Sequence, residues 1–93
     1  MKNKVIFKKY YNGNIVAAFP QMPGDNSHFN MQCYEHVGQH GSGAESYLSL
    51  LKPAKPHEYA ELLAELKAIG YDVKIAHRFT QKDYEIRKAQ LSN

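Results

Sequence analysis

Asn12-Gly13 separates two β-rich segments, and this pattern constrains the fold more than any other in the chain. The two segments are 5–11 (VIFKKYY) and 14–19 (NIVAAF). An Asn-Gly pair adopts the left-handed backbone angles of the primed turns, whose twist matches that of two paired antiparallel strands. The pattern therefore predicts a β-hairpin near the beginning of the chain.

The rest of the chain alternates between strand and helix patterns. Residues 20–27 are rich in Pro, Gly, Asn and Asp, so the second strand is expected to end at Pro20. Apolar residues recur every three or four positions over 56–69, where a proline begins the predicted helix and Gly70 ends it. The other predicted elements are a strand over 29–37, a short helix over 43–51, a strand over 71–79 and a final helix after Thr80. For 44–51, a strand remains the alternative.

These elements fit a single α+β domain spanning residues 1–93. A chain of 93 residues, 43% of them hydrophobic, has room for one core only. The predicted architecture is an antiparallel-rich sheet packed on one main helix, in the order β-β-β-(α)-α-β-α. Residues 81–93 are expected either to dock as a C-terminal helix or to fray.

Composition favours a reducing compartment and argues against membranes. The single Cys33 cannot form an internal disulfide, and no apolar run approaches the roughly 20 residues of a membrane helix. The N-terminal residues lack the apolar segment of a signal peptide. We therefore expect a cytoplasmic protein, and the net charge of +3 favours anionic partners only mildly.

The segment 33–43 (CYEHVGQHGSG) is the best candidate for a functional site. It places two histidines, which titrate near neutral pH, among glycines that let a ligand approach the backbone. Gly38 and Gly41 are expected to end the third strand, and Ser42 with Glu45 fits a capping box for the following helix. A glycine-rich turn before a helix N-terminus can receive an anion. The predicted binding residues are Tyr34, His36, Gly38, His40, Gly41 and Ser42.

A metal site is an alternative use of this segment. Cys33, His36 and His40 have spacings that occur in zinc sites. On a regular strand, however, the odd separation of Cys33 and His36 puts their side chains on opposite faces. We therefore predict no bound metal and no cofactor, with Cys33 as an apolar filler. His77, on the apolar face of the last predicted strand, is expected to be a core residue.

Several short motifs follow one another in a fixed order: Asn12-Gly13, HVGQHG at 36–41, Pro53-Ala54, EYA at 58–60 and Gly70-Tyr71. Together they resemble a group of small uncharacterised proteins encoded by bacteriophages and bacterial mobile elements, over residues 5–79. The resemblance implies a phage or mobile-element origin. It implies no activity, because the family has no assigned catalytic residues that could be transferred to His36 or His40.

No complete catalytic signature accompanies these features, so we predict a small non-catalytic binding module. Its partner is expected to be a host protein or an anionic ligand, bound at the glycine-histidine turn or on an open sheet face. Tyrosines would either anchor that partner or cover the sheet edge. They are Tyr10, Tyr11, Tyr34 and Tyr47.

Two alternatives stay open. In a small hydrolase or nuclease, His36 and His40 would act as acid and base, or would hold a metal together with Glu35. In a nucleic-acid-binding protein, the N-terminal lysines and basic residues near the C-terminus would contact phosphates. Those C-terminal residues are Arg78, Arg87 and Lys88.

Overall fold

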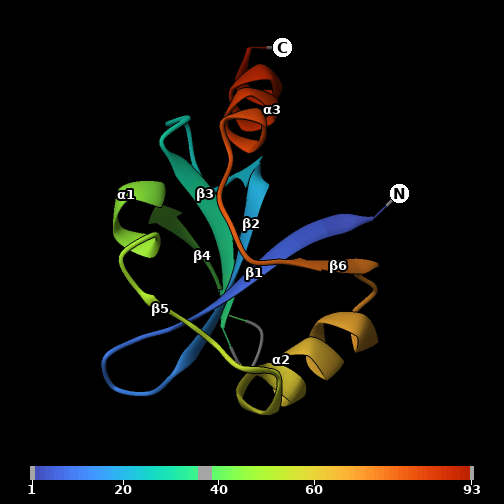
Figure 1. Ribbon diagram of the computed structural model, residues 1–93. Coiled ribbons are helices and arrows are strands. Elements are labelled where there is room, and N and C mark those ends of the chain that lie inside the picture. The colour runs from blue at the N-terminus through green and yellow to red at the C-terminus, as the bar shows by residue number, and fades with distance from the viewer. Residues whose placement is uncertain (1, 36–38, 93) are drawn as a thin grey trace.

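A computed structural model describes residues 2–35 and 39–92 of the chain (Figure 1). Within these residues the protein is a small α+β domain with six strands and three helices, which confirms the predicted fold class. The strands are β1 (Asn3–Lys9), β2 (Ile15–Pro23), β3 (Asn30–Glu35), β4 (Gln39–Ala44), β5 (Lys52–Pro53) and β6 (Val73–Ala76). The helices are α1 (Glu45–Leu48), α2 (Pro56–Ala68) and α3 (Gln81–Leu91).

The strands form one antiparallel-rich sheet with the order β4-β3-β2-β1, and β5 and β6 share the far side of β1. β5 pairs antiparallel with the C-terminal end of β1, whereas β6 pairs parallel with its N-terminal half. The other pairs are antiparallel. β4 therefore forms one edge of the sheet, and the short strands β5 and β6 form the other.

The predicted hairpin joins β1 and β2. Its turn is closed by a 2.9 Å hydrogen bond from the Gly13 N–H to the Tyr10 carbonyl. Gly13 has a φ of +90°, an angle that residues with a side chain rarely adopt, which explains the glycine at this position. The hairpin is confirmed, but its loop spans Tyr11, Asn12 and Gly13 instead of the predicted two residues.

α2 covers one face of the sheet. Phe7, Phe19 and Tyr34 point to this face and pack against Leu62 and Leu66 of α2. Both leucines are fully buried, and burial of such a side chain contributes about 1.5–3 kcal/mol before entropy is subtracted. The helix predicted over 56–69 is thus the main helix of this face, as expected.

The opposite face of the sheet is also covered, so the open face predicted from the sequence is wrong. A second hydrophobic cluster lies there beneath Leu48 of α1. Side chains alternate along β1, so Lys4 points to this same face, where it meets Asp83 of α3. α2 and α3 therefore lie on opposite sides of the sheet (Figure 1). The members of the second cluster are Val16, Ala18, Met31, Cys33, Leu48 and Leu51.

Several strand boundaries differ from the prediction, and two of the differences have a clear structural cause. β2 continues through Pro20, because a register shift between Phe19 and Pro23 accommodates the prolines at a bulge. β6 ends at Ala76, because β5 takes over the pairing edge of β1 beyond that point. His77 lies past the strand and is exposed, so its predicted core position is wrong.

The C-terminal segment is helical and packed against β2 rather than frayed (Figure 1). Thr80 and Asp83 form a capping box at its start: the Asp83 N–H donates to the Thr80 hydroxyl at 3.2 Å, and the Thr80 N–H donates to the Asp83 carboxylate at 3.1 Å. None of the helices in the described part of the chain is long and apolar enough to cross a membrane.

Candidate functional site

Most of the glycine-histidine segment is a β-strand. β4 pairs residue by residue with β3 over Gln39–Ala44, so Gly41 lies within a strand and does not end one. Glycine weakens the interior of a strand, but the ladder to β3 and the packing of Leu48 behind it hold β4 in place. His36 and Gly38, two of the predicted binding residues, lie outside the described residues.

The predicted capping box does not form. α1 begins at Glu45 directly after β4, and its cap residue, Ala44, makes no side-chain hydrogen bond. Ser42 instead donates a 2.7 Å hydrogen bond to the Asp25 carboxylate. The predicted glycine turn before a helix is therefore wrong, and the anion-binding role argued from that arrangement loses its basis.

Tyr34 and His40 face the same side of the sheet as α2. They are direct cross-strand partners, and their rings meet edge to face with centres 4.7 Å apart. Tyr34 is buried and donates a hydrogen bond to Glu65, so it supports the site from below and does not reach a partner itself. His40 is exposed, and its Nε2 lies 3.3 Å from the Tyr71 hydroxyl oxygen. Two tyrosines thus hold the His40 ring at the surface.

Alternate backbone groups of β4 face away from the sheet. The Glu45 N–H donates to the Phe29 carbonyl at 3.2 Å, so position 45 is one of the positions whose backbone groups bond to the β3 side. Because bonded pairs alternate in an antiparallel ladder, positions 39, 41 and 43 bond to β3. The N–H and C=O groups of His40, Ser42 and Ala44 therefore point outward, and within the described residues no second strand pairs with them.

The two edges of the sheet differ in their protection. At the far edge, β5 consists of Lys52 and Pro53, and the four-residue β6 carries Lys74. Short strands, lysine and proline are the means by which natural sheets prevent edge pairing. β4 has six residues, QHGSGA, with no charge and no proline. It is the unprotected edge of the sheet.

The two glycines of β4 have different surroundings. A Cβ at Gly43 would lie 3.0 Å from the Cys33 sulfur and 3.1 Å from a methyl of Leu48, so glycine there allows α1 to pack closely. A Cβ at Gly41 would meet nothing within 4 Å, and Gly41 is exposed. Packing therefore explains Gly43, whereas Gly41 leaves space on the strand surface for an incoming side chain.

Cys33 is buried next to this strand, in agreement with its expected role as an apolar filler. Burial, and to a smaller extent the charge of Glu35, raises the pKa of its thiol to about 11. In the described ranges, no group of three His, Cys, Asp or Glu side chains is placed to hold a metal ion.

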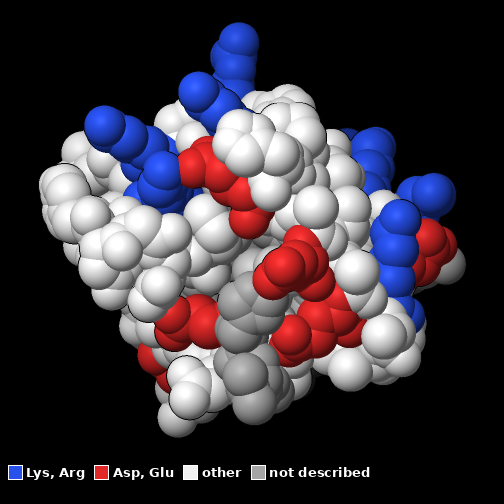
Figure 2. Space-filling model, turned by 90° about the horizontal axis from the view of Figure 1, so that it is seen from below, with Lys and Arg blue, Asp and Glu red and all other residues white. Residues whose placement is uncertain are grey.

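Acidic side chains gather on the face that α2 covers, and basic side chains lie around its margin (Figure 2). α2 itself carries Glu58, Glu61 and Glu65. His40 shares this face, so an anion that approached His40 from this side would meet negative charge. The surroundings of β4 therefore favour a neutral or basic partner.

The tyrosines considered as anchors differ in exposure. Tyr34 is buried and Tyr10 is partly buried, whereas Tyr47 is 49% and Tyr11 93% exposed. Of these four side chains, Tyr11 exposes most of its surface and Tyr47 about half, so these two are accessible to a partner. The other two belong to the sheet's own packing.

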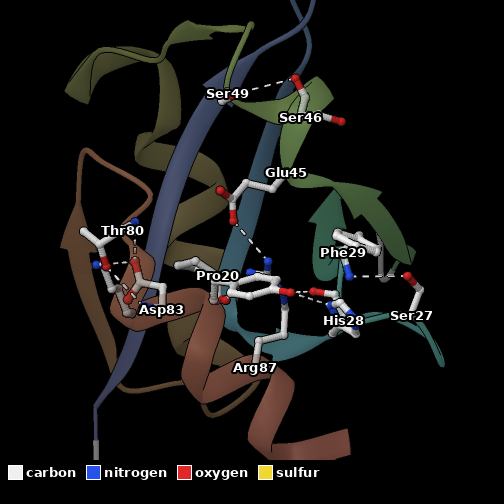
Figure 3. A network of polar contacts seen from close by, with 12 residues as sticks. Pro20, Ser27, His28, Phe29, Glu45, Ser46, Ser49, Thr80, Asp83 and Arg87 are labelled. Carbon is white, nitrogen blue, oxygen red and sulfur yellow. Dashed lines mark hydrogen bonds and ion pairs between the residues drawn. The ribbon is translucent and has the colours of Figure 1, made fainter.

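A polar network beneath α3 was not predicted from the sequence (Figure 3). Arg87 is completely buried, and its guanidinium donates to the carbonyl oxygens of Pro20 at 2.6 Å and His28 at 2.8 Å. It also donates to Glu45 of α1 at 3.0 Å. Arg87 therefore ties α3 to β2, to the loop before β3 and to α1.

Asp83, one turn earlier in α3, is buried as well. Asp83 and Arg87 are one helical turn apart, a spacing at which opposite charges can pair, but the Asp83 carboxylate instead accepts hydrogen bonds from Lys4 at 2.7 Å and Gln21 at 3.0 Å. Burial alone would raise the pKa of Asp83; hydrogen bonds from Lys4, Gln21 and Thr80 outweigh that effect and hold the pKa below its ordinary value. The scarcity of apolar residues in α3 was the one sequence signal for such polar docking.

Comparisons with known proteins give no identification. No family model, curated protein sequence or solved structure matches the chain significantly. The resemblance to small phage and mobile-element proteins therefore stays a prediction. Function has to be argued from the geometry of the chain itself.

Proposed function

We propose that this protein is a small binding module that captures an extended segment of a partner protein by strand addition to β4. The observation that carries this proposal is the contrast between the unprotected edge at β4 and the protected far edge. An added strand satisfies the outward backbone groups of His40, Ser42 and Ala44. Those main-chain hydrogen bonds supply affinity without requiring a particular sequence in the partner.

The side chains of β4 add some selectivity. On the α2 side, His40 is exposed and fixed by Tyr34 and Tyr71, so it presents a defined polar contact. On the sheet face opposite α2, Gly41 has no side chain, so the backbone of β4 is uncovered there. A large side chain of the partner strand covers such an edge glycine. We infer a partner segment with an apolar residue facing Gly41.

Ser42 offers a matched pair of variants to test this proposal. The Ser42 N–H points outward, so Ser42→Pro removes a donor from the open edge without breaking a bond to β3. Ser42→Ala removes the same hydroxyl, and with it the bond to Asp25, but keeps the N–H. The protein is immobilised and used to capture partners from a nuclease-treated bacterial lysate. Capture by the wild type and by Ser42→Ala, but not by Ser42→Pro, supports strand addition.

Amide hydrogen exchange identifies the bound edge residue by residue. With a captured partner, the amides of His40, Ser42 and Ala44 should become protected, whereas those of Gly41 and Gly43 are already protected in the free protein. Equal capture by Ser42→Pro, or protection confined to other elements, would contradict the proposal.

The nucleic-acid alternative is tested by repeating the capture without nuclease treatment. Partners lost on nuclease treatment would support nucleic-acid binding, for which Arg87 is unsuited because it is buried in the network under α3. The hydrolase or nuclease alternative has less support from the contacts of His40, whose ring neighbours in the described structure are Tyr34 and Tyr71. Strand addition remains the function that the geometry supports best.

A further inference from the structure

A groove runs between α1 and the segment that leads into α3, on the sheet face opposite α2. It consists of two hollows of about 300 Å³ each, and Glu45 and Ser49 line both of them. One hollow extends to Phe29, and the other extends to Lys8 and Phe79. Part of this region is visible in Figure 3, where Glu45 reaches toward Arg87. Hollows of this size accommodate a small ligand.

Among the described residues, each buried charged side chain around the groove forms an ion pair with a side chain of opposite charge, except Lys8. Arg87 pairs with Glu45 at 3.0 Å, and Lys4 pairs with Asp83 at 2.7 Å. Lys8 is 7% exposed, yet none of the described carboxylates lies within 4 Å of its ammonium group. A buried cation without a counter-charge destabilises the folded protein unless an anion accompanies it.

The surroundings of Lys8 leave its ammonium group available to a ligand. Its Nζ donates one long hydrogen bond, 3.4 Å to the Leu51 carbonyl, and lies 5.6 Å from the centre of the Phe79 ring. Burial lowers the pKa of Lys8 from its ordinary value, as expected for an ammonium group that lacks an anionic partner. Arg78, which also lines this hollow, is exposed and makes no ion pair with any described residue.

We propose that this groove binds the phosphate group of a small phosphorylated molecule, with Lys8 as the central cation. A phosphate dianion matches the two unpaired cations, Lys8 and Arg78, better than a single carboxylate does. Ser49 lines both hollows, and its hydroxyl, which donates a long 3.3 Å hydrogen bond to the Ser46 carbonyl, can turn to donate to a phosphate oxygen instead. The rings of Phe79 and of Phe29, which is 62% exposed, provide apolar surface for the rest of the ligand.

The test is an NMR titration of the protein with two probes, inorganic phosphate and phenyl phosphate, at constant ionic strength. Saturable shifts of the Ser49 and Phe79 amides are expected with both probes, and phenyl phosphate should bind more tightly because of the aromatic side chains. Lys8→Met keeps the apolar stem and should weaken binding about tenfold or more. Lys52→Met makes the same change on the neighbouring strand, outside the groove, and should leave binding unchanged.

Arg78→Gln is a second variant that does not depend on the core, because Arg78 is exposed. It should also weaken phosphate binding, while thermal melts show an unchanged fold. Lys8→Met should melt at the same temperature as the wild type or higher, since it removes an unpaired buried charge. Absence of saturable shifts in the wild type, or equal affinity in Lys8→Met and Lys52→Met, would overturn the phosphate site. If inorganic phosphate binds as tightly as phenyl phosphate, the proposal that the phosphate belongs to a larger phosphorylated molecule is refuted.

Discussion

Replacing Arg87 with methionine tests the polar network that holds α3. Methionine has a similar length, so Arg87→Met leaves little cavity and removes mainly the guanidinium hydrogen bonds. The Pro20 carbonyl then lies buried without its donor, which costs about 1–3 kcal/mol. The His28 carbonyl is partly buried and loses about 1 kcal/mol, and Glu45, which is 36% exposed, can turn to water at smaller cost. We expect a total loss of about 3 kcal/mol.

This loss is large for a chain of 93 residues, whose free energy of unfolding is expected to be about 5–14 kcal/mol. Urea unfolding followed by circular dichroism measures the difference, provided that the slope with urea stays constant between variants. Lys88→Met is the control, because Lys88 is the exposed neighbour in the same helix and its replacement should change stability by less than about 0.5 kcal/mol. A loss below about 1 kcal/mol in Arg87→Met would refute the argument that these bonds anchor α3.

Other measurements test separate parts of the structure. Leu66→Ala should lower the free energy of unfolding by about 2–5 kcal/mol in urea, because Leu66 is fully buried against the sheet. Gly43→Ala should be less stable than Gly41→Ala by about 1 kcal/mol, because only the first places a Cβ against neighbouring side chains. Iodoacetamide at about pH 8 should modify Cys33 only as fast as the protein unfolds, because burial raises its pKa to about 11; rapid modification of the folded protein would contradict this. The polar contacts that lower the pKa of Asp83 stabilise the folded protein at pH values above about 4, the pKa of an unfolded aspartate. This stabilisation is lost as the pH falls through the lower pKa of the folded state. Asp83→Asn should therefore make the free energy of unfolding in urea less dependent on pH in the acid range.

The turns and helix ends that depend on neighbouring residues were predicted correctly from the sequence. Gly13 has the positive φ that the Asn-Gly pair indicates, and Gly70 has a φ of +111° at the end of α2. Pro56 begins that helix, and Thr80 caps α3 through its own hydroxyl. Each of these features depends on residues within one turn of the chain, so single-sequence chemistry is sufficient to predict them.

The elements that were predicted wrongly depend on distant residues. The glycines of β4 favour a turn, yet the ladder to β3 extends them into a strand, because pairing along the whole of β3 outweighs the weak local preference. The polar docking of α3 joins Lys4 to Asp83, which are 79 residues apart in the sequence. A charged pair at helical spacing has the same pattern whether its members meet each other or separate buried partners. The partners of Asp83 and Arg87 therefore could not be predicted from their positions in the sequence.

The composition of β4 is the part of the candidate site that packing does not explain. The close approach of α1 accounts for Gly43, but nothing in the described fold requires glycine at position 41 or excludes a charged residue from this strand. The same sheet blocks its far edge with Lys52, Pro53 and Lys74, so edge protection is compatible with this fold. An open edge also carries a risk of aggregation, and a single lysine or proline in the strand is enough to reduce that risk. A protein that does not use the edge for binding is therefore expected to carry such a residue there. The absence of such a residue from β4 is therefore the strongest argument that this edge is kept free for a partner strand.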